Sequence, residues 1–160
     1  IDFFSGDGET GISASNRIRG VVLHEILSRM TVASDLEKAA RQSLDSGDVT
    51  AGEYEEVVDL LRERVASACE RGWFPEDSAE ILNETDLIDK HGKVFRPDRV
   101  VISDGKVTVI DYKFGEHNSQ YERKLRKYAG IWNSMGYIDV SAYLWYVHTD
   151  QVIRVDCSLD

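Results

Sequence analysis

The dipeptide Asp104-Gly105 lies between two runs of strand-like residues, 94–102 and 106–113, and it constrains the fold more than any other feature. An Asp-Gly pair flanked by apolar and β-branched residues is a strong signal for the turn of a β-hairpin. Such a turn also fixes the register, because residues at equal distances from it pair across the two strands. The sequence therefore predicts an antiparallel hairpin centred on this turn.

That register places Asp98 opposite Asp111 on one face of the hairpin. Opposed residues have Cβ atoms ~5 Å apart, and like charges placed this way destabilise a sheet unless something offsets them. A divalent cation such as Mg²⁺ is suited to this because it prefers oxygen ligands. Lys113 lies two residues beyond Asp111 and shares its face. A metal and an ammonium group at one place suit the hydrolysis of a phosphodiester.

Apolar residues at helical spacing predict three helices in the first half of the chain. The first has apolar positions from Ile18 to Leu27, the second runs over about 34–44, and the third follows Thr50 with apolar positions up to Ala68. Either Ser13 or Ser15 can cap the first of them. Thr50 and Glu53 form a capping-box signature at the start of the third, and Gly72 ends it. The N-terminal half is therefore expected to be helical.

The second half favours strands over 79–88, 94–102, 106–113, 140–147 and 152–155, with a helix over 119–135. This order predicts an α/β protein with a central mixed sheet of about five strands, flanked by helices. A length of 160 residues supports a single domain, which we place at 13–160. Residues 1–12, rich in glycine and acidic residues, are expected to form a mobile tail.

Pro97-Asp98 and Asp111-Tyr112-Lys113 together resemble the motif of the PD-(D/E)XK nuclease superfamily. The resemblance extends over about residues 17–147. The segment 19–27, which contains His24 in a G-x-x-x-H pattern, looks like the first helix of RecB/AddA-type nuclease domains. Tyr121 and Tyr128, with a leucine between them, resemble the helix that follows the active site in that family.

This resemblance implies a restriction-endonuclease-like fold and a deoxyribonuclease, specifically an exonuclease, that depends on Mg²⁺ or Mn²⁺. The nearest likeness is to the C-terminal nuclease domain of UvrD-like helicase–nucleases. The chain is accordingly expected to be a piece of a longer protein. Its implied partners are DNA and the helicase domains of that parent chain, acting together in double-strand-break repair and recombination.

Position by position, the resemblance assigns three kinds of role. The catalytic residues are Asp98, Asp111 and Lys113. The metal ligands are His24, Asp98, Asp111 and the backbone carbonyl of Tyr112, with Glu84, on the first strand, in a second shell or at a second metal. The residues implied to contact DNA are Gln120, Tyr121, Lys124 and Tyr128. The family usually has Gln where this chain has Lys124, so either Gln120 replaces it from one turn earlier or Lys124 itself contacts a phosphate.

The residues alone leave several of these roles open. A lone histidine such as His24 among apolar neighbours is usually a core residue, and Tyr121 and Tyr128 can equally be core aromatics. Trp132, Trp145 and Tyr146 are predicted to be core. His91, His117 and His148 receive no role.

The net charge of −10 argues, taken alone, against a nucleic-acid partner. The charge is uneven, however, with 20 acidic against 8 basic residues in 1–89 and 9 against 11 in 90–160. The half that holds the candidate site is thus slightly basic, and DNA is not excluded. We expect weak DNA affinity that depends on a divalent metal.

Two cysteines, Cys69 and Cys157, cannot supply the four ligands of an iron–sulfur cluster. No apolar run approaches the ~18 residues of a membrane span, so no membrane partner is expected and a cytoplasmic location is the default. Two other interpretations stay open. One is a catalytically silent nuclease-like module for DNA binding or protein docking, and the other is an acidic α/β interaction domain whose Asp pair binds Ca²⁺ structurally.

Overall fold

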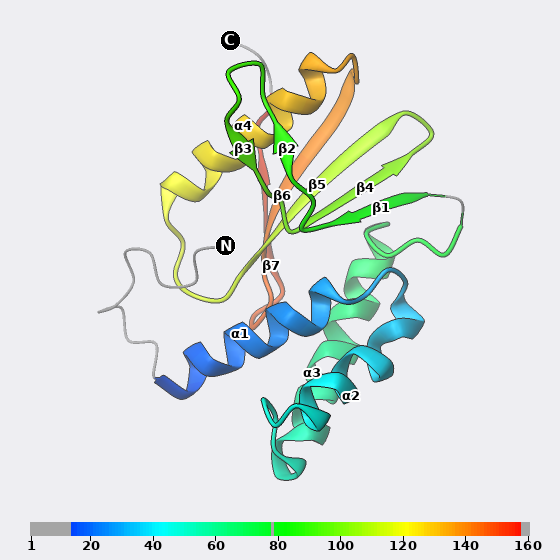
Figure 1. Ribbon diagram of the computed structural model, residues 1–160, viewed down its shortest axis with the longest axis vertical. Coiled ribbons are helices and arrows are strands. Elements are labelled where there is room, and N and C mark those ends of the chain that lie inside the picture. The colour runs from blue at the N-terminus through cyan, green and yellow to red at the C-terminus, as the bar shows by residue number, and fades with distance from the viewer. Residues whose placement is uncertain (1–13, 78, 158–160) are drawn as a thin grey trace. The chain divides into compact units, whose positions relative to one another are not determined.

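The computed structural model of the protein describes residues 14–77 and 79–157 (Figure 1). These residues divide into two compact units, which we call the helical unit (14–77) and the sheet unit (79–157). The tail predicted at 1–12 and the cap predicted at Ser13 lie outside the described residues. The assignment of 13–160 to a single domain stays a prediction.

The helical unit contains α1 (Ala14–Ser28), the 3-10 turn η1 (Ala33–Asp35), α2 (Leu36–Asp45) and α3 (Ala51–Glu70). The predicted capping box is present, because a carboxylate oxygen of Glu53 accepts the Thr50 N–H at 3.2 Å and the Thr50 hydroxyl at 2.8 Å. Gly72, with a φ of 81°, ends α3 in the left-handed conformation. The three predicted helices are confirmed.

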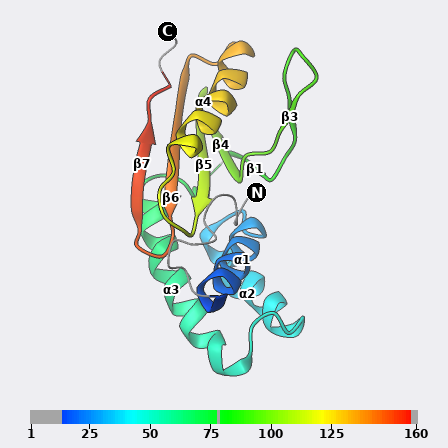
Figure 2. The same cartoon turned by 90° about the vertical axis from the view of Figure 1, so that its left-hand side faces the viewer.

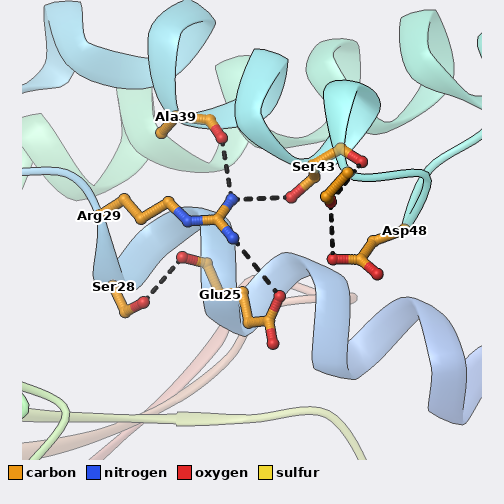
Figure 3. A network of polar contacts seen from close by, with 7 residues as sticks. Glu25, Ser28, Arg29, Ala39, Ser43 and Asp48 are labelled. Atoms are coloured by element: carbon orange, nitrogen blue, oxygen red, sulfur yellow. Dashed lines mark hydrogen bonds and ion pairs between the residues drawn. The ribbon is translucent and has the colours of Figure 1, made fainter.

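Arg29, just beyond the end of α1, connects α1 to α2 (Figure 3). One guanidinium nitrogen donates to the Ala39 carbonyl at 3.1 Å and to the Ser43 hydroxyl at 2.8 Å. The other lies 3.5 Å from the Glu25 carboxylate. Ser43 is fully buried, so its hydroxyl needs such a partner. Each of these three partners carries a negative charge or a lone pair, which suits a guanidinium.

The sheet unit is built on a five-stranded sheet in the order β1-β4-β5-β6-β7. Its strands are β1 (Glu80–Asn83), β4 (Arg99–Ser103), β5 (Lys106–Lys113), β6 (Asp139–Tyr146) and β7 (Gln151–Val155). Only β5 and β6 are parallel, and α4 (Ser119–Ser134) connects them. The predicted α/β fold with a mixed sheet of five strands and a helical N-terminal half is confirmed.

The turn between β4 and β5 sets the predicted register. Asp104 and Gly105 both have positive φ, 52° and 78°, as a type I′ turn requires. Arg99 pairs with Ile110 and Ser103 with Lys106, so the hairpin is centred on the turn as the sequence indicates.

Two predicted strands are shorter than expected. The runs 79–88 and 94–102 were each predicted to be continuous, and this is wrong. Glu84, with a φ of 49°, turns the chain after β1, and Pro97 has no N–H to donate before β4. The outer residues instead form a separate hairpin of β2 (Leu87–Ile88) and β3 (Val94–Phe95), which stands apart from the sheet in Figure 2.

The core of the sheet unit lies between α4 and the sheet. From α4 it takes Leu125, Ala129 and Trp132, and from the sheet Val109 and Leu144. Trp145 is fully buried and packs edge-on against Tyr112, with ring centroids 5.7 Å apart. The prediction that Trp132, Trp145 and Tyr146 belong to the core is confirmed.

Candidate metal centre

Asp98 and Asp111 lie next to each other where the β4–β5 hairpin ends. Asp98 directly precedes β4, Asp111 is in β5, and both are buried, with 0% and 6% of their surface exposed. The Asp98 N–H lies 3.4 Å from a carboxylate oxygen of Asp111, and the Tyr112 N–H donates to the Asp98 carboxylate at 2.7 Å. The hairpin register thus brings the two carboxylates together as predicted.

Lys113 shares their face, as the alternation of β5 predicts. Its ammonium nitrogen lies 3.2 Å from a carboxylate oxygen of Asp111 and 4.1 Å from the centre of the Tyr121 ring. Only 8% of Lys113 is exposed. A buried ammonium held by a carboxylate and an aromatic face loses much of its rotational freedom, so its position in the site is fixed.

The two carboxyl groups have opposite pKa shifts. Burial raises the pKa of Asp98 well above its ordinary value, and the negative charge of Asp111 raises it further. Burial also raises the pKa of Asp111, but the Lys113 ammonium and hydrogen bonds from Asp98 and Lys113 outweigh it, so this pKa is lowered. The pair therefore favours a single shared proton without a metal. A divalent cation would take the place of that proton.

Glu84 adds a third carboxylate within the sheet unit. It was predicted on the first strand, which is wrong, because β1 ends at Asn83 and Glu84 follows in the left-handed conformation. Its N–H donates to the Asp98 carbonyl at 3.1 Å. One carboxylate oxygen of Glu84 and one of Asp98 lie within 4.8 Å of each other. This brings Glu84 to the side of Asp98, where its carboxylate can reach a cation bound there.

The four residues predicted to contact DNA fall into two classes. Gln120 and Lys124 are exposed on α4, and the positive charge of Lys124 helps to lower the pKa of Asp111. Tyr121 and Tyr128 are buried between α4 and the sheet, where Tyr128 packs edge-on against Phe95 at 5.4 Å. Contact of these four residues with DNA stays a prediction, and the burial of the tyrosines leaves little ring surface for a ligand.

His24 lies on α1, in the helical unit. Tyr112 is in β5, beside Asp111. Their predicted parts in a metal shell, the His24 imidazole and the Tyr112 carbonyl, both stay predictions.

Sequence reasoning missed two polar residues near the site. His117, in the loop between β5 and α4, has one ring nitrogen 2.7 Å from the Tyr146 hydroxyl and the other 3.1 Å from the Glu122 carboxylate. Arg99 is fully buried, and its guanidinium donates to the Asn83 side chain at 3.3 Å. No local pattern marks either residue, because the Tyr146 and Asn83 partners lie in other strands and only Glu122 is near His117 in the chain.

No family model matches the chain, and no curated protein matches it. Within the described residues, every helix is too short or too polar to cross a lipid bilayer. Any function must therefore be argued from the site itself.

Proposed function

We propose that this protein is a metal-dependent deoxyribonuclease domain that hydrolyses phosphodiester bonds from a DNA end. The observation that carries the proposal is the buried pair of Asp98 and Asp111 with the Lys113 ammonium 3.2 Å from Asp111. Two carboxylates brought together in a buried place are costly without a cation, and structural ion pairs rarely place like charges side by side. The resemblance to PD-(D/E)XK nucleases supports the same conclusion.

The residues present fit a hard divalent cation. The side chains of Asp98 and Asp111 offer carboxylate oxygens as metal ligands. The lowered pKa of Asp111 favours its ionised form, which is the form that binds a metal. Asp98 and Asp111 would hold the ion, Mg²⁺ or Mn²⁺, with Glu84 close to Asp98. Such an ion lowers the pKa of bound water and takes up negative charge on the phosphate.

Lys113 serves the reacting phosphate directly in this proposal. The Asp111 carboxylate and the Tyr121 ring hold its ammonium at 3.2 Å and 4.1 Å. From there it can orient the attacking water or stabilise the extra negative charge of the transition state. Preorganised charges of this kind contribute about 10²–10³ in rate.

The setting of the reaction follows from the resemblance. We propose that the domain works as an exonuclease beside the helicase domains of a longer chain in double-strand-break repair and recombination. The motor would deliver the DNA end, so weak DNA affinity of the 160-residue chain fits this role.

The test is digestion of linear DNA with Mg²⁺ or Mn²⁺, measured as released nucleotides. We expect Asp111→Asn to abolish digestion and Lys113→Ala to lower it by about 10²–10³. Asp104→Asn and Lys106→Ala are matched controls, because they change the same residue types at the far end of the same hairpin. Both should digest DNA like the unchanged chain.

Two outcomes would contradict the proposal. If Asp111→Asn digests DNA as fast as the unchanged chain, Asp111 takes no part in the reaction and the proposed site is wrong. An unchanged chain that stays inactive when joined to its helicase, yet binds DNA, would support the catalytically silent module.

A further inference from the structure

A groove lies between the β2–β3 hairpin and α4, within the sheet unit. Its volume is about 640 Å³, and it is lined by Lys90, Lys93 and Phe95 from the hairpin and by Lys127 and Ile131 from α4. This is the size of a small-ligand site. It would take a few nucleotides of one strand rather than a duplex.

The groove carries an excess of positive charge. Lys90, Lys93 and Lys127 are all exposed, and none of them forms an ion pair with another described residue. The one acid in the lining is Asp89. Its carboxylate accepts the Lys93 N–H at 2.9 Å and the His91 N–H at 2.8 Å, and these bonds lower its pKa. Asp89 therefore stays ionised and held in its own turn, where the Lys93 charge also lowers its pKa. Three ammonium groups against this one carboxylate still leave the lining with an excess of positive charge.

The hairpin also fixes the position of one of these charges. The Lys93 ammonium lies 5.2 Å from the centre of the Phe95 ring, and Phe95 itself packs on Tyr128 of α4. A cation held over an aromatic face keeps its charge available on the other side. Phe95 is buried, so it supports the lysine rather than offering a surface for base stacking.

Positive charge continues from the groove toward the carboxylates. Lys127 and Lys124 are three residues apart on α4 and therefore neighbours on its surface, ~4.5 Å apart along the helix axis. Lys124 is near enough to Asp111 to lower the pKa of that group. A polyanion in the groove would therefore meet a fourth lysine, Lys124, on its way to Asp98 and Asp111.

We propose that this groove binds the sugar–phosphate backbone of single-stranded DNA and leads it along α4 to the candidate metal centre. The destination of the strand rests on the proposed nuclease function, whereas binding in the groove does not. Lysine contacts to phosphates carry no sequence information, so binding should be independent of sequence and should weaken with salt.

The experiment measures fluorescence anisotropy of a labelled oligothymidylate against salt concentration. EDTA is present, so that cleavage and the metal-dependent part of the affinity play no part and only direct contacts such as those of the groove are measured. The test variant carries Lys90→Ala, Lys93→Ala and Lys127→Ala. The matched control carries Lys38→Ala, Arg41→Ala and Arg62→Ala, which remove three basic residues from a groove of the helical unit. Circular dichroism checks that both variants fold like the unchanged chain.

We expect the slope of log affinity against log salt to become shallower by about 2 in the test variant, since each phosphate contact on a single strand contributes about 0.7. Taking this electrostatic contribution as absent near ~1 M salt, the affinity at ~0.1 M should fall about a hundredfold. The control variant should keep the original slope.

The results separate this proposal from the nuclease proposal. If the test variant binds DNA with an unchanged slope, the groove proposal is wrong, even if Asp111→Asn still abolishes digestion. If the unchanged chain binds polyglutamate of equal charge through these lysines but not DNA, the proposal is also wrong. If the test variant has the shallower salt slope but the unchanged chain never digests DNA, the groove proposal is supported and only the nuclease proposal is contradicted.

Discussion

Both units place a charged side chain against a buried polar group, Arg29 against Ser43 and Asp98 against Asp111, but they do so in opposite ways. In the helical unit, the Arg29 guanidinium meets a carboxylate, a carbonyl and a hydroxyl, all of which suit a cation. In the sheet unit, the Asp98 carboxyl group meets the carboxyl group of Asp111, and burial and this neighbour both raise its pKa. One cluster is electrostatically complementary and the other is in conflict.

Of the two clusters, the one in the sheet unit is the candidate for a function. A complementary cluster is explained by the stability that it gives, because it joins α1 to α2. A buried conflict lowers stability, and local rules are broken in this way mainly at functional sites. Variants of the two clusters, Mg²⁺ and pH should each affect the two units differently.

Asp98→Asn should separate activity from stability. The carboxamide keeps an acceptor for the Tyr112 N–H and offers Asp111 a donor, but it is a poor metal ligand. We expect digestion of DNA to fall about a thousandfold, equivalent to about 4 kcal/mol. The free energy of unfolding in EDTA should rise by about 1.4 kcal/mol for each unit by which the Asp98 pKa is raised. A variant that loses both activity and stability would show that the pair is structural.

Arg29→Ala should have the opposite pattern. Its loss leaves the buried Ser43 hydroxyl and the Ala39 carbonyl without this donor, so we expect a loss of about 2 kcal/mol in the free energy of unfolding. Urea denaturation measures this loss. Arg62→Ala, which removes exposed ion pairs with Asp59 and Glu37, is the matched control and should cost less than about 1 kcal/mol. An equal loss in both variants would mean that Arg29 contributes no more than a surface residue.

Mg²⁺ should stabilise the fold around Asp98 and Asp111 and have no effect around Arg29. At about ten times its dissociation constant, an ion that binds only the folded state adds about 1.4 kcal/mol. Amide hydrogen exchange can follow β5 and α2 separately. We expect slower exchange in β5 with Mg²⁺, and no change in Asp98→Asn. Equal protection of β5 in that variant would place the ion elsewhere.

The contributions of Glu53 in the helical unit and Asp98 in the sheet unit to the free energy of unfolding should change with pH in opposite directions. Hydrogen bonds from Thr50 lower the pKa of Glu53 below its ordinary value of 4.5, so its contribution to stability is present above that value and is lost as pH falls through the lowered pKa. The pKa of Asp98 is raised above 3.8, so its contribution is present below that value and is lost as pH rises through the raised pKa.

Unfolding in EDTA across a pH series measures both effects. In the acid range, the free energy of unfolding of the unchanged chain should rise with pH relative to that of Glu53→Gln. The free energy of unfolding of the unchanged chain should instead fall relative to that of Asp98→Asn as pH rises. Trends of the same sign would contradict the contrast between the two units.

Much of the fold could be predicted because its signals are local. Thr50 and Glu53 are within one helical turn, and Asp104 and Gly105 adopt the positive φ values that their residue types favour. Once this turn is placed, the alternation of β5 settles that Asp111 and Lys113 share a face. The break after β1 could not be predicted in this way, because Glu84 adopts a φ of 49° that its residue type does not favour.

The element types, the hairpin register and the opposition of Asp98 and Asp111 follow from local sequence, since each depends on residues near one another or on one turn. Tertiary structure alone decided which distant groups join them. It placed Glu84 beside Asp98, Tyr121 under the Lys113 ammonium, and the hairpin lysines opposite Lys127. The physical reason is that such contacts form only when segments far apart in the chain pack together, and no periodicity or turn signal within one segment records its partner.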